Sequence, residues 1–432
     1  MSERTRRDLL RVAGGVGVAG LAGCSSLGAD PPLDGGSALG DTDLPLSLDD
    51  RPQSPDGLTS QFRQGLRNHG HIDAAIPETV EVEWSVPTNR GDHTASKGSP
   101  IRAPTGDVLV AGDTGHIRSI ATDGTTNWST PLSDVDRGSH GTPAIADGTA
   151  YVGTYDGVVS AVSVASGDIL WQTDVGDAAA ASPTYHEGTL YVAVEYSTPS
   201  GTVVAMDAET GDVLWRDDRP TDQPHSTVAV DLERDRFLFG ANDGRVYAWS
   251  LSGPEREWTF DTGGDVKAPI AVSRGIALVP SWSGTVTAVD VADGTGLWQF
   301  ETDGFVPGVS DPDRTGGVMC APAVHDGTVY VGSHDGNVYA VDLATGEGLW
   351  STPTDGWITG SVTATSDHVL VGSKDAHLYA LDRADGSVTW SIEGNGYATS
   401  APFVADGAVY YTERASESTD EPGMCYKLAT PE

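Results

Sequence analysis

Tryptophan recurs at a nearly constant interval along most of this chain, and that interval constrains the fold more than any other feature. The spacing ranges from 40 residues (Trp258 to Trp298) to 52 residues (Trp298 to Trp350). A period near 43 residues accommodates four short strands and their turns, as in one blade of a β-propeller. The repeat therefore predicts an all-β fold, a single eight-bladed β-propeller of four-stranded antiparallel blades. The eight blade tryptophans are Trp84, Trp128, Trp171, Trp215, Trp258, Trp298, Trp350 and Trp390.

The clearest copy of the repeat runs from Ala321 to Trp350 and shows why each unit forms a blade. Its apolar residues alternate in three runs, which is the pattern of half-buried strands. Asp-Gly pairs such as Asp335-Gly336 supply the positive φ that tight hairpin turns require. We expect the final tryptophan to fill the space between neighbouring blades.

The first and last units are incomplete in complementary ways. No three-strand pattern precedes Trp84, whereas the last unit, from Pro402 through Leu428, lacks a fourth strand and its tryptophan. We therefore expect the strand around Trp84 to complete the last blade. This closure joins the ends of the ring and removes its open sheet edges. The propeller is predicted to span residues 84–432.

The first 24 residues are typical of an export signal. Arg6-Arg7 precedes a short apolar run at 12–23, which is too short to span a bilayer and resembles a twin-arginine signal. Residues 21–24 resemble a lipobox, in which Cys24 becomes the lipid-modified start of the mature chain. We expect the protein on the outer face of the cell membrane after Tat export, anchored through Cys24. The alternative is an uncleaved membrane anchor with an incidental cysteine.

Two segments separate this signal from the repeats. Residues 25–57 are rich in Gly, Pro, Ser and Asp and have little to bury, so we expect a disordered tether. Residues 58–83 form a lead-in to the propeller. Beyond Cys24, the chain contains Cys320 and Cys425, which fall in non-adjacent units and are expected to be buried free thiols. No Cys/His cluster has the spacing of a zinc site.

Acidic residues outnumber basic ones by 62 to 25, which gives a net charge of -37. A field of this sign repels polyanions, so nucleic acid is excluded as a partner. Only four of the basic residues are lysines. Acid-rich, lysine-poor surfaces resemble those of proteins that stay soluble in molar salt, where charges are screened within about 3 Å. We therefore expect a halophilic, haloarchaeal source; the alternative is an ordinary acidic surface.

The repeat itself resembles a known family. The stretch 327–332, followed by Asp335-Gly336 and the ending 346–350, is similar to the PQQ-like propeller repeat, and the resemblance covers about residues 84–432. Residues 61–70 also resemble the lead-in of extracytoplasmic members. The family contains quinoprotein dehydrogenases and non-catalytic members similar to BamB, a lipoprotein of the bacterial outer-membrane assembly machine. The repeat is specific for the fold and weak for function.

Candidate ligand-binding residues lie in the loops expected at one face of the ring. We name the four strands of a blade A to D. The D-to-A and B-to-C connections share the face where the funnel opens. Cations and aromatic rings in these loops favour an anionic or flat ligand. The candidates are Lys97, Arg137, His140, His225, Lys267, Trp282, His334, Trp357, Lys374 and Tyr397. The alternative is that loops simply collect polar residues and that the histidines are structural.

The resemblance implies a test for PQQ chemistry. A quinoprotein dehydrogenase needs acidic and amide ligands for calcium, a carboxylate base and usually a vicinal cysteine pair, and no Cys-Cys dipeptide occurs here. The 52-residue interval contains an insertion with Phe305, Asp311, Asp313 and Arg314. Asp311 and Asp313 are the candidate metal ligands, and the alternative is a charged surface loop.

Other enzyme motifs are missing from the sequence: there is no GxSxG elbow, P-loop or HExxH, so no catalytic residue is assigned. Asn127-Trp128-Ser129 is a glycosylation sequon, in which we expect the neighbouring tryptophan to limit access to Asn127.

We therefore expect a monomeric, membrane-anchored propeller that binds or organises extracytoplasmic protein partners without a cofactor. The alternative is a small quinoprotein dehydrogenase, or a ligand sensor, that binds PQQ with calcium or another anionic ligand in the funnel. The compact blades and the missing cysteine pair favour the first function.

Overall fold

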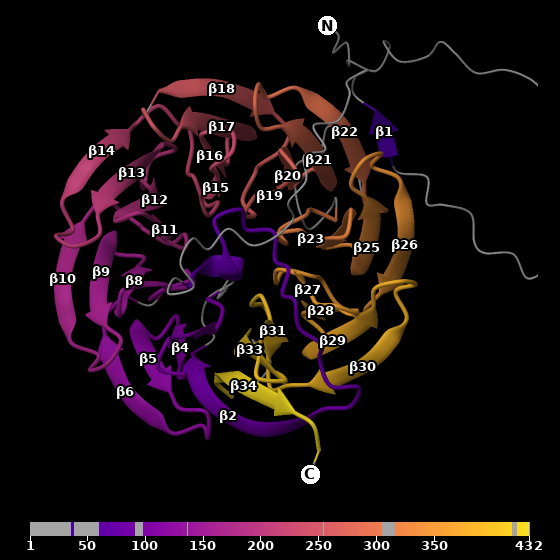
Figure 1. The fold of residues 1–432 in the computed structure, drawn as a ribbon, viewed down its shortest axis with the longest axis horizontal. Helices are drawn as coiled ribbons and strands as arrows, with labels where there is room; N and C mark the ends of the chain where they lie inside the picture. Colours follow the sequence, from indigo (N-terminus) through magenta and orange to yellow (C-terminus); the bar gives the residue numbers. More distant parts are fainter. Residues whose placement is uncertain are drawn as a thin grey trace, which may run out of the picture. The chain divides into compact units, whose positions relative to one another are not determined.

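A computed structural model describes residues 60–90, 98–135, 137–253, 255–304, 316–416 and 421–431, together with the backbone of 36–38. These residues fall in one compact unit, Pro32–Glu432, and form eight antiparallel sheets. Figure 1 shows the sheets placed radially about a central axis, which confirms the predicted eight-bladed β-propeller. No described helix is both long and apolar enough to cross a membrane.

The first four blades each consist of four consecutive strands, paired in sequence order. Blade 1 contains β3 (Ile101–Arg102), β4 (Val108–Ala111), β5 (His116–Ile120) and β6 (Thr126–Pro131); blade 2 contains β7 (Ala144–Ala146), β8 (Thr149–Gly153), β9 (Val158–Ser163) and β10 (Ile169–Asp174); blade 3 contains β11 (Thr184–His186), β12 (Thr189–Glu195), β13 (Gly201–Asp207) and β14 (Val213–Asp217); blade 4 contains β15 (Ala229–Asp231), β16 (Arg236–Gly240), β17 (Arg245–Ser250) and β18 (Arg256–Asp261).

The last four blades follow the same order, with an additional strand in blades 5 and 8. Blade 5 contains β19 (Ala271–Ser273), β20 (Ile276–Ser281), β21 (Thr285–Asp290), β22 (Gly296–Glu301) and β1 (Gly36–Ala38); blade 6 contains β23 (Ala323–His325), β24 (Thr328–Gly332), β25 (Asn337–Asp342) and β26 (Gly348–Pro353); blade 7 contains β27 (Thr363–Ala364), β28 (His368–Gly372), β29 (His377–Asp382) and β30 (Val388–Glu393); blade 8 contains β31 (Tyr397–Ala398), β32 (Phe403–Ala405), β33 (Ala408–Arg414), β34 (Gly423–Ala429) and β2 (Glu81–Asn89).

Blade 8 closes the ring as the repeat count predicts. Strand β2 pairs antiparallel with β34, and Trp84 lies opposite Lys427. The N-terminal part of the propeller therefore supplies the outermost strand of the last blade, and the sheet edge that β34 would otherwise expose is paired. Cys320 and Cys425 are buried and not disulfide-bonded, as expected.

The blade tryptophans connect neighbouring blades by a hydrogen bond as well as by packing. In six of them the indole Nε1 donates to a backbone carbonyl just after strand C of the next blade, at 2.9 to 3.1 Å: Trp84 to Thr122, Trp128 to Val164, Trp171 to Ala208, Trp258 to Val291, Trp298 to Leu343 and Trp350 to Arg383. Trp390 donates to the carbonyl of Pro77 instead, and Trp215 packs edge-on against Phe237. A buried indole N–H needs a partner, and the turn of the next blade provides it.

The lead-in forms a plug at the centre of the ring. We call residues 60–72 the plug segment; it contains the 3-10 helix η1 (Phe62–Gln64), which Figure 1 shows at the central axis. Its backbone or side chains pair with the innermost strands of six blades in order: Ser60 with Ile145 (β7), Gln61 with Tyr185 (β11), Leu66 with Val230 (β15), Arg67 with Val272 (β19), His69 with Val324 (β23) and Gly70 with Ala364 (β27). The inner edge of each of these blades thereby finds a hydrogen-bond partner.

Two arginines fix the plug segment among the blades. Arg63 donates to the carbonyls of Ala321 and Pro322 at 2.8 and 2.7 Å. Arg67 forms an ion pair with Asp231 at 3.2 Å, and both side chains are almost fully buried. A buried charge is stable only when it is paired and hydrogen-bonded, so these contacts hold the segment in one place.

Strand β1 is a departure from the predicted tether at 25–57. It pairs antiparallel with β22, placing Ala38 opposite Trp298. On β22, Leu297 is only 4% exposed, whereas Leu170 and Leu214 at the same position of blades 2 and 3 are 56% and 60% exposed. The composition of the tether hides this strand because an unpaired outer edge can bind a short segment through its backbone alone.

The sequon behaves differently from our expectation of limited access. Asn127 is exposed on β6, while Trp128 is partly buried. Consecutive side chains of a strand point to opposite faces, so the tryptophan does not cover its neighbour.

Candidate functional site

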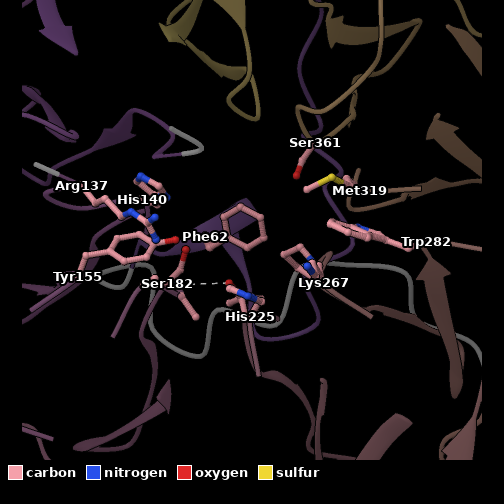
Figure 2. Close-up of a pocket in the computed structure, with 14 residues that line it drawn as sticks. Phe62, Arg137, His140, Tyr155, Ser182, His225, Lys267, Trp282, Met319 and Ser361 are labelled. Carbon is pink, nitrogen blue, oxygen red and sulfur yellow. Dashed lines mark hydrogen bonds between the residues drawn. The ribbon is translucent and has the colours of Figure 1, made fainter. Parts of the chain in front are cut away.

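A cavity opens on the face formed by the D-to-A and B-to-C loops. Its volume is about 270 Å³, and we call it the funnel recess. The lining residues are Phe62, Arg137, His140, Tyr155, Ala180, Ala181, Ser182, His225, Thr227, Lys267, Pro269, Trp282, Met319 and Ser361. Phe62 belongs to the plug segment and lies at the centre of the recess in Figure 2. The plug segment therefore contributes directly to the recess.

Five of the predicted ligand-binding residues meet here. His140, His225, Lys267 and Trp282 line the funnel recess, and Arg137 from the same loop as His140 lines it too. They come from four loops, namely the D-to-A loops before blades 2, 4 and 5 and the B-to-C loop of blade 5. Strand order within each blade brings these loops to one face, which is why the topology alone predicts the grouping.

One wall of the recess is a lysine on a tryptophan. The Lys267 Nζ atom lies 3.5 Å from the centroid of the Trp282 ring. The carboxylate of Asp265 is 3.7 Å from the same nitrogen. Burial lowers the pKa of Lys267 and raises the pKa of Asp265, since each loses water on this wall. The ring face holds the ammonium in position by its negative quadrupole.

The opposite wall combines an arginine, a tyrosine and a histidine. The Arg137 guanidinium lies 5.5 Å from the Tyr155 ring centroid, and the His140 ring meets Tyr155 edge-on at 4.4 Å. Burial raises the pKa of the Tyr155 phenol above its ordinary value of 10.0, so the side chain stays uncharged. Figure 2 shows this group and the Lys267–Trp282 pair on opposite sides of Phe62.

The lining residue His225 contacts a carboxylate that is not part of the lining. Its Nδ1 atom is 2.6 Å from Oε1 of Glu195, whose side chain is buried. This contact orients the imidazole. It also places a carboxylate next to the recess without making it part of the lining.

The other predicted residues form a second group on the same face, outside the recess lining. His334 stacks on Trp357 with ring centroids 5.0 Å apart. Lys374 Nζ lies 4.7 Å from Trp357 and 5.7 Å from Tyr397. Arg414, which the sequence analysis does not single out, lies 5.5 Å from Tyr397. We call these five residues the rim cluster.

Several predicted residues lie outside the part of the chain that the structure describes. They are Cys24, Lys97, Phe305, Asp311, Asp313 and Arg314. Among the described residues, no group of three or more His, Cys, Asp or Glu side chains is arranged to hold a metal ion.

The recess does not match the donor set that calcium-bound PQQ requires. Calcium takes carboxylate, amide and carbonyl oxygens. The described lining offers the hydroxyls of Ser182, Thr227 and Ser361 but no carboxylate or amide side chain. Its cations and rings fit an anionic or aromatic group, and the described residues alone do not fit the metal that would accompany a quinone.

Sequence reasoning misses nine lining residues: the larger ones are Phe62, Tyr155 and Met319, and the smaller ones are Ala180, Ala181, Ser182, Thr227, Pro269 and Ser361. Phe62 lies in the lead-in, which has no repeat pattern, and Tyr155 occupies a B-to-C loop position that other blades fill with Trp282 or His334. Comparison of that loop position between repeats is the signal that could have found Tyr155.

Three overlapping stretches of the chain, 113–258, 200–356 and 282–416, match the model of the family described as outer membrane protein assembly factor BamB. The BamB of Yersinia pestis is 28% identical over 238 residues, which cover 52% of this chain and 59% of that protein, so the match spans little more than half of this relative.

Two solved structures share the fold. BamB from Moraxella catarrhalis superposes with a TM-score of 0.63 at 17% identity, covering 82% of this chain and 100% of that one. Quinohemoprotein alcohol dehydrogenase from Comamonas testosteroni superposes with a TM-score of 0.71 at 14% identity, covering 86% and 81%. At these identities the likeness concerns the fold only. The repeats, the ring of eight blades and the family match together place the chain in the BamB-described family of PQQ-like β-propellers.

Proposed function

We propose that this chain is an exported, lipid-anchored propeller that binds protein partners through its funnel face. The observation that carries the proposal is the make-up of the funnel recess. Its floor is closed by Phe62 of the plug segment, and its walls present cations stacked on aromatic rings. Aromatic side chains and arginine are the groups that dominate binding energy in protein interfaces.

The family supports the same proposal. Family members include proteins named as assembly factors, and relatives named as dehydrogenases match shorter parts of this chain. The recess lining that the structure describes contains no carboxylate or amide side chain to bind the calcium that accompanies a quinone, which supports partner binding over oxidation. Arg6-Arg7 and Cys24 support export and anchoring at the membrane surface.

The test is site-specific photo-cross-linking in cells that make the protein. A photoreactive residue replaces Asp355, an exposed residue of the D-to-A loop before blade 7, or Asp385, an exposed residue of the C-to-D turn of the same blade. These positions lie at opposite ends of the strands and differ little in chemistry. We expect discrete cross-linked protein bands from position 355 and none from position 385.

A parallel titration addresses the dehydrogenase. Purified mature protein is mixed with PQQ and calcium, and absorbance, melting temperature and dye-linked alcohol oxidation are followed. Saturable quinone binding with turnover would overturn the proposal, as would equal cross-linking from both faces.

A further inference from the structure

Four positive charges of the funnel face share one arrangement: each lies near the face of an aromatic ring. The pairs are Arg137 on Tyr155, Lys267 on Trp282, Lys374 on Trp357 and Tyr397, and Arg414 on Tyr397. The chain contains only 25 basic residues against 62 acidic ones. In such a chain, a recess whose described lining contains Arg137 and Lys267 but no carboxylate differs in charge from the chain as a whole.

The two recess cations are held in fixed positions. Figure 2 shows Arg137 and Lys267 on opposite sides of Phe62, each beside its own ring. A cation held on an aromatic ring keeps its charge and loses conformational freedom before a ligand arrives, so less entropy is lost on binding. Asp265 lies 3.7 Å from Lys267 but is not one of the residues that line the recess.

The recess is suited to a ligand that is both acidic and apolar. Phe62, Trp282 and Met319 offer apolar contact, whereas Arg137 and Lys267 offer charge-assisted hydrogen bonds. The rim cluster lies on the same face and offers one further cation, Lys374, whereas Arg414 of that cluster is buried. A small monocarboxylate would contact either the recess or the rim cluster, whereas an extended segment with several carboxylates would contact both.

We propose that the funnel recess and the rim cluster bind an acidic segment of a protein partner, with a carboxylate between Arg137 and Lys267 and an apolar side chain against Phe62 and Trp282. This proposal rests on the proposed function and specifies the chemistry of the partner. Charge complementarity favours an acidic segment, because the described recess lining contains two cations and no carboxylate.

The experiment uses the full mature protein and a fluorescent decapeptide with two glutamates and one phenylalanine in a Gly/Ser background. Binding is measured by anisotropy, with the corresponding glutamine peptide as the neutral control. We expect Lys267→Met to weaken binding by about tenfold, the loss of one charge-assisted contact. Lys427→Met is the matched control, since it removes the same charge from β34, where Lys427 pairs with Glu83 at 2.8 Å.

Thermal melting of both variants verifies that each is folded. Trp282→Leu, which keeps the charge but removes the ring, is expected to weaken binding by a similar factor. Equal binding of the glutamine peptide, or equal weakening by the two lysine variants, would overturn the proposal. So would free phenylacetate that displaces the peptide at concentrations near the peptide's own Kd, because the site would then be one for small molecules.

The two proposals fail in different ways. Cross-links from position 355 without binding of the acidic peptide contradict only the acidic segment. Loss of the cross-links contradicts partner binding by this face altogether.

Discussion

Substituting Gly211 by alanine tests how neighbouring blades are joined. Gly211 lies in the C-to-D turn of blade 3 at φ +78, and a Cβ atom there would sit 2.7 Å from the Trp171 ring of blade 2. Trp171 also donates from Nε1 to Ala208, and Thr173 donates to the carbonyl of Gly211 at 2.9 Å. The added methyl group must therefore displace the tryptophan from the turn that it joins.

The expected loss of stability has three parts. The left-handed backbone conformation costs alanine about 1 kcal/mol. Loss of the indole hydrogen bond costs about 1 kcal/mol, and overpacking against the ring costs about 1 to 3 kcal/mol. Gly211→Ala is therefore expected to lower the free energy of unfolding by about 3 to 5 kcal/mol.

The chain contains a matched control in the same blade. Gly188 has φ +80, and a Cβ atom there meets nothing within 4 Å. Gly188→Ala should therefore cost only the backbone part, about 1 kcal/mol. Urea unfolding followed by tryptophan fluorescence and by far-ultraviolet circular dichroism compares the two variants, and coincident transitions of the two probes support a two-state treatment.

A double-mutant cycle with Trp171→Ala isolates the contact. Without the ring, Gly211→Ala should cost no more than Gly188→Ala, which leaves a coupling energy of about 2 to 4 kcal/mol. If the two glycine variants lose the same stability in the wild-type background, the tryptophan does not hold the blades together in the way described here.

Three further predictions follow from the structure. Burial raises the pKa of Glu413 to about 8, from an ordinary value of 4.5, so the contribution of this group to stability is fully present below pH 4.5 and is lost as the pH rises through 8. In a pH series of melting temperatures, Glu413→Gln should lose this part of the decline at alkaline pH, and an equal decline in the variant would disprove the assignment. Arg67→Met leaves the buried Asp231 without one of its cations and should cost about 3 kcal/mol in urea unfolding, whereas the pair Arg67→Met with Asp231→Asn should recover part of the loss. Cys24→Ser should move the protein from the membrane to the soluble fraction in cell fractionation, and retention in the membrane would support an uncleaved anchor.

The repeated features of the fold could be predicted from the sequence because the same residue pattern recurs in each blade. Trp84 and Trp390 mark the first and last D strands, and the missing strand of the last unit predicts the pairing of β2 with β34. The same strand order predicts that His140, His225, Lys267 and Trp282 share a face. Loop conformation then decides that Lys374 and Trp357 lie in the rim cluster and outside the recess, and no residue pattern encodes that choice.

The plug segment could not be predicted for a different physical reason. Its contacts with β7, β15, β19, β23 and β27 are mostly made by backbone groups, which every residue type possesses. Phe62 has no counterpart in the repeats, so nothing in its spacing points to the recess. Strand β1 is hidden in the same way, since its pairing with β22 requires only an available edge.

The plug segment contacts the blades in sequence order, and this order limits how this family can change its number of repeats. An open array of repeats gains or loses a unit by altering one interface, and its stability is roughly a sum over neighbours. Here, between Ser60 and Gly70, six successive blades each form a hydrogen bond with a segment that precedes all of them in the chain. A duplicated blade would have an inner edge with no assigned partner, and a deleted blade would leave part of the segment unpaired. Blade duplication must therefore be accompanied by a change in the length of the lead-in, so the two should vary together among relatives.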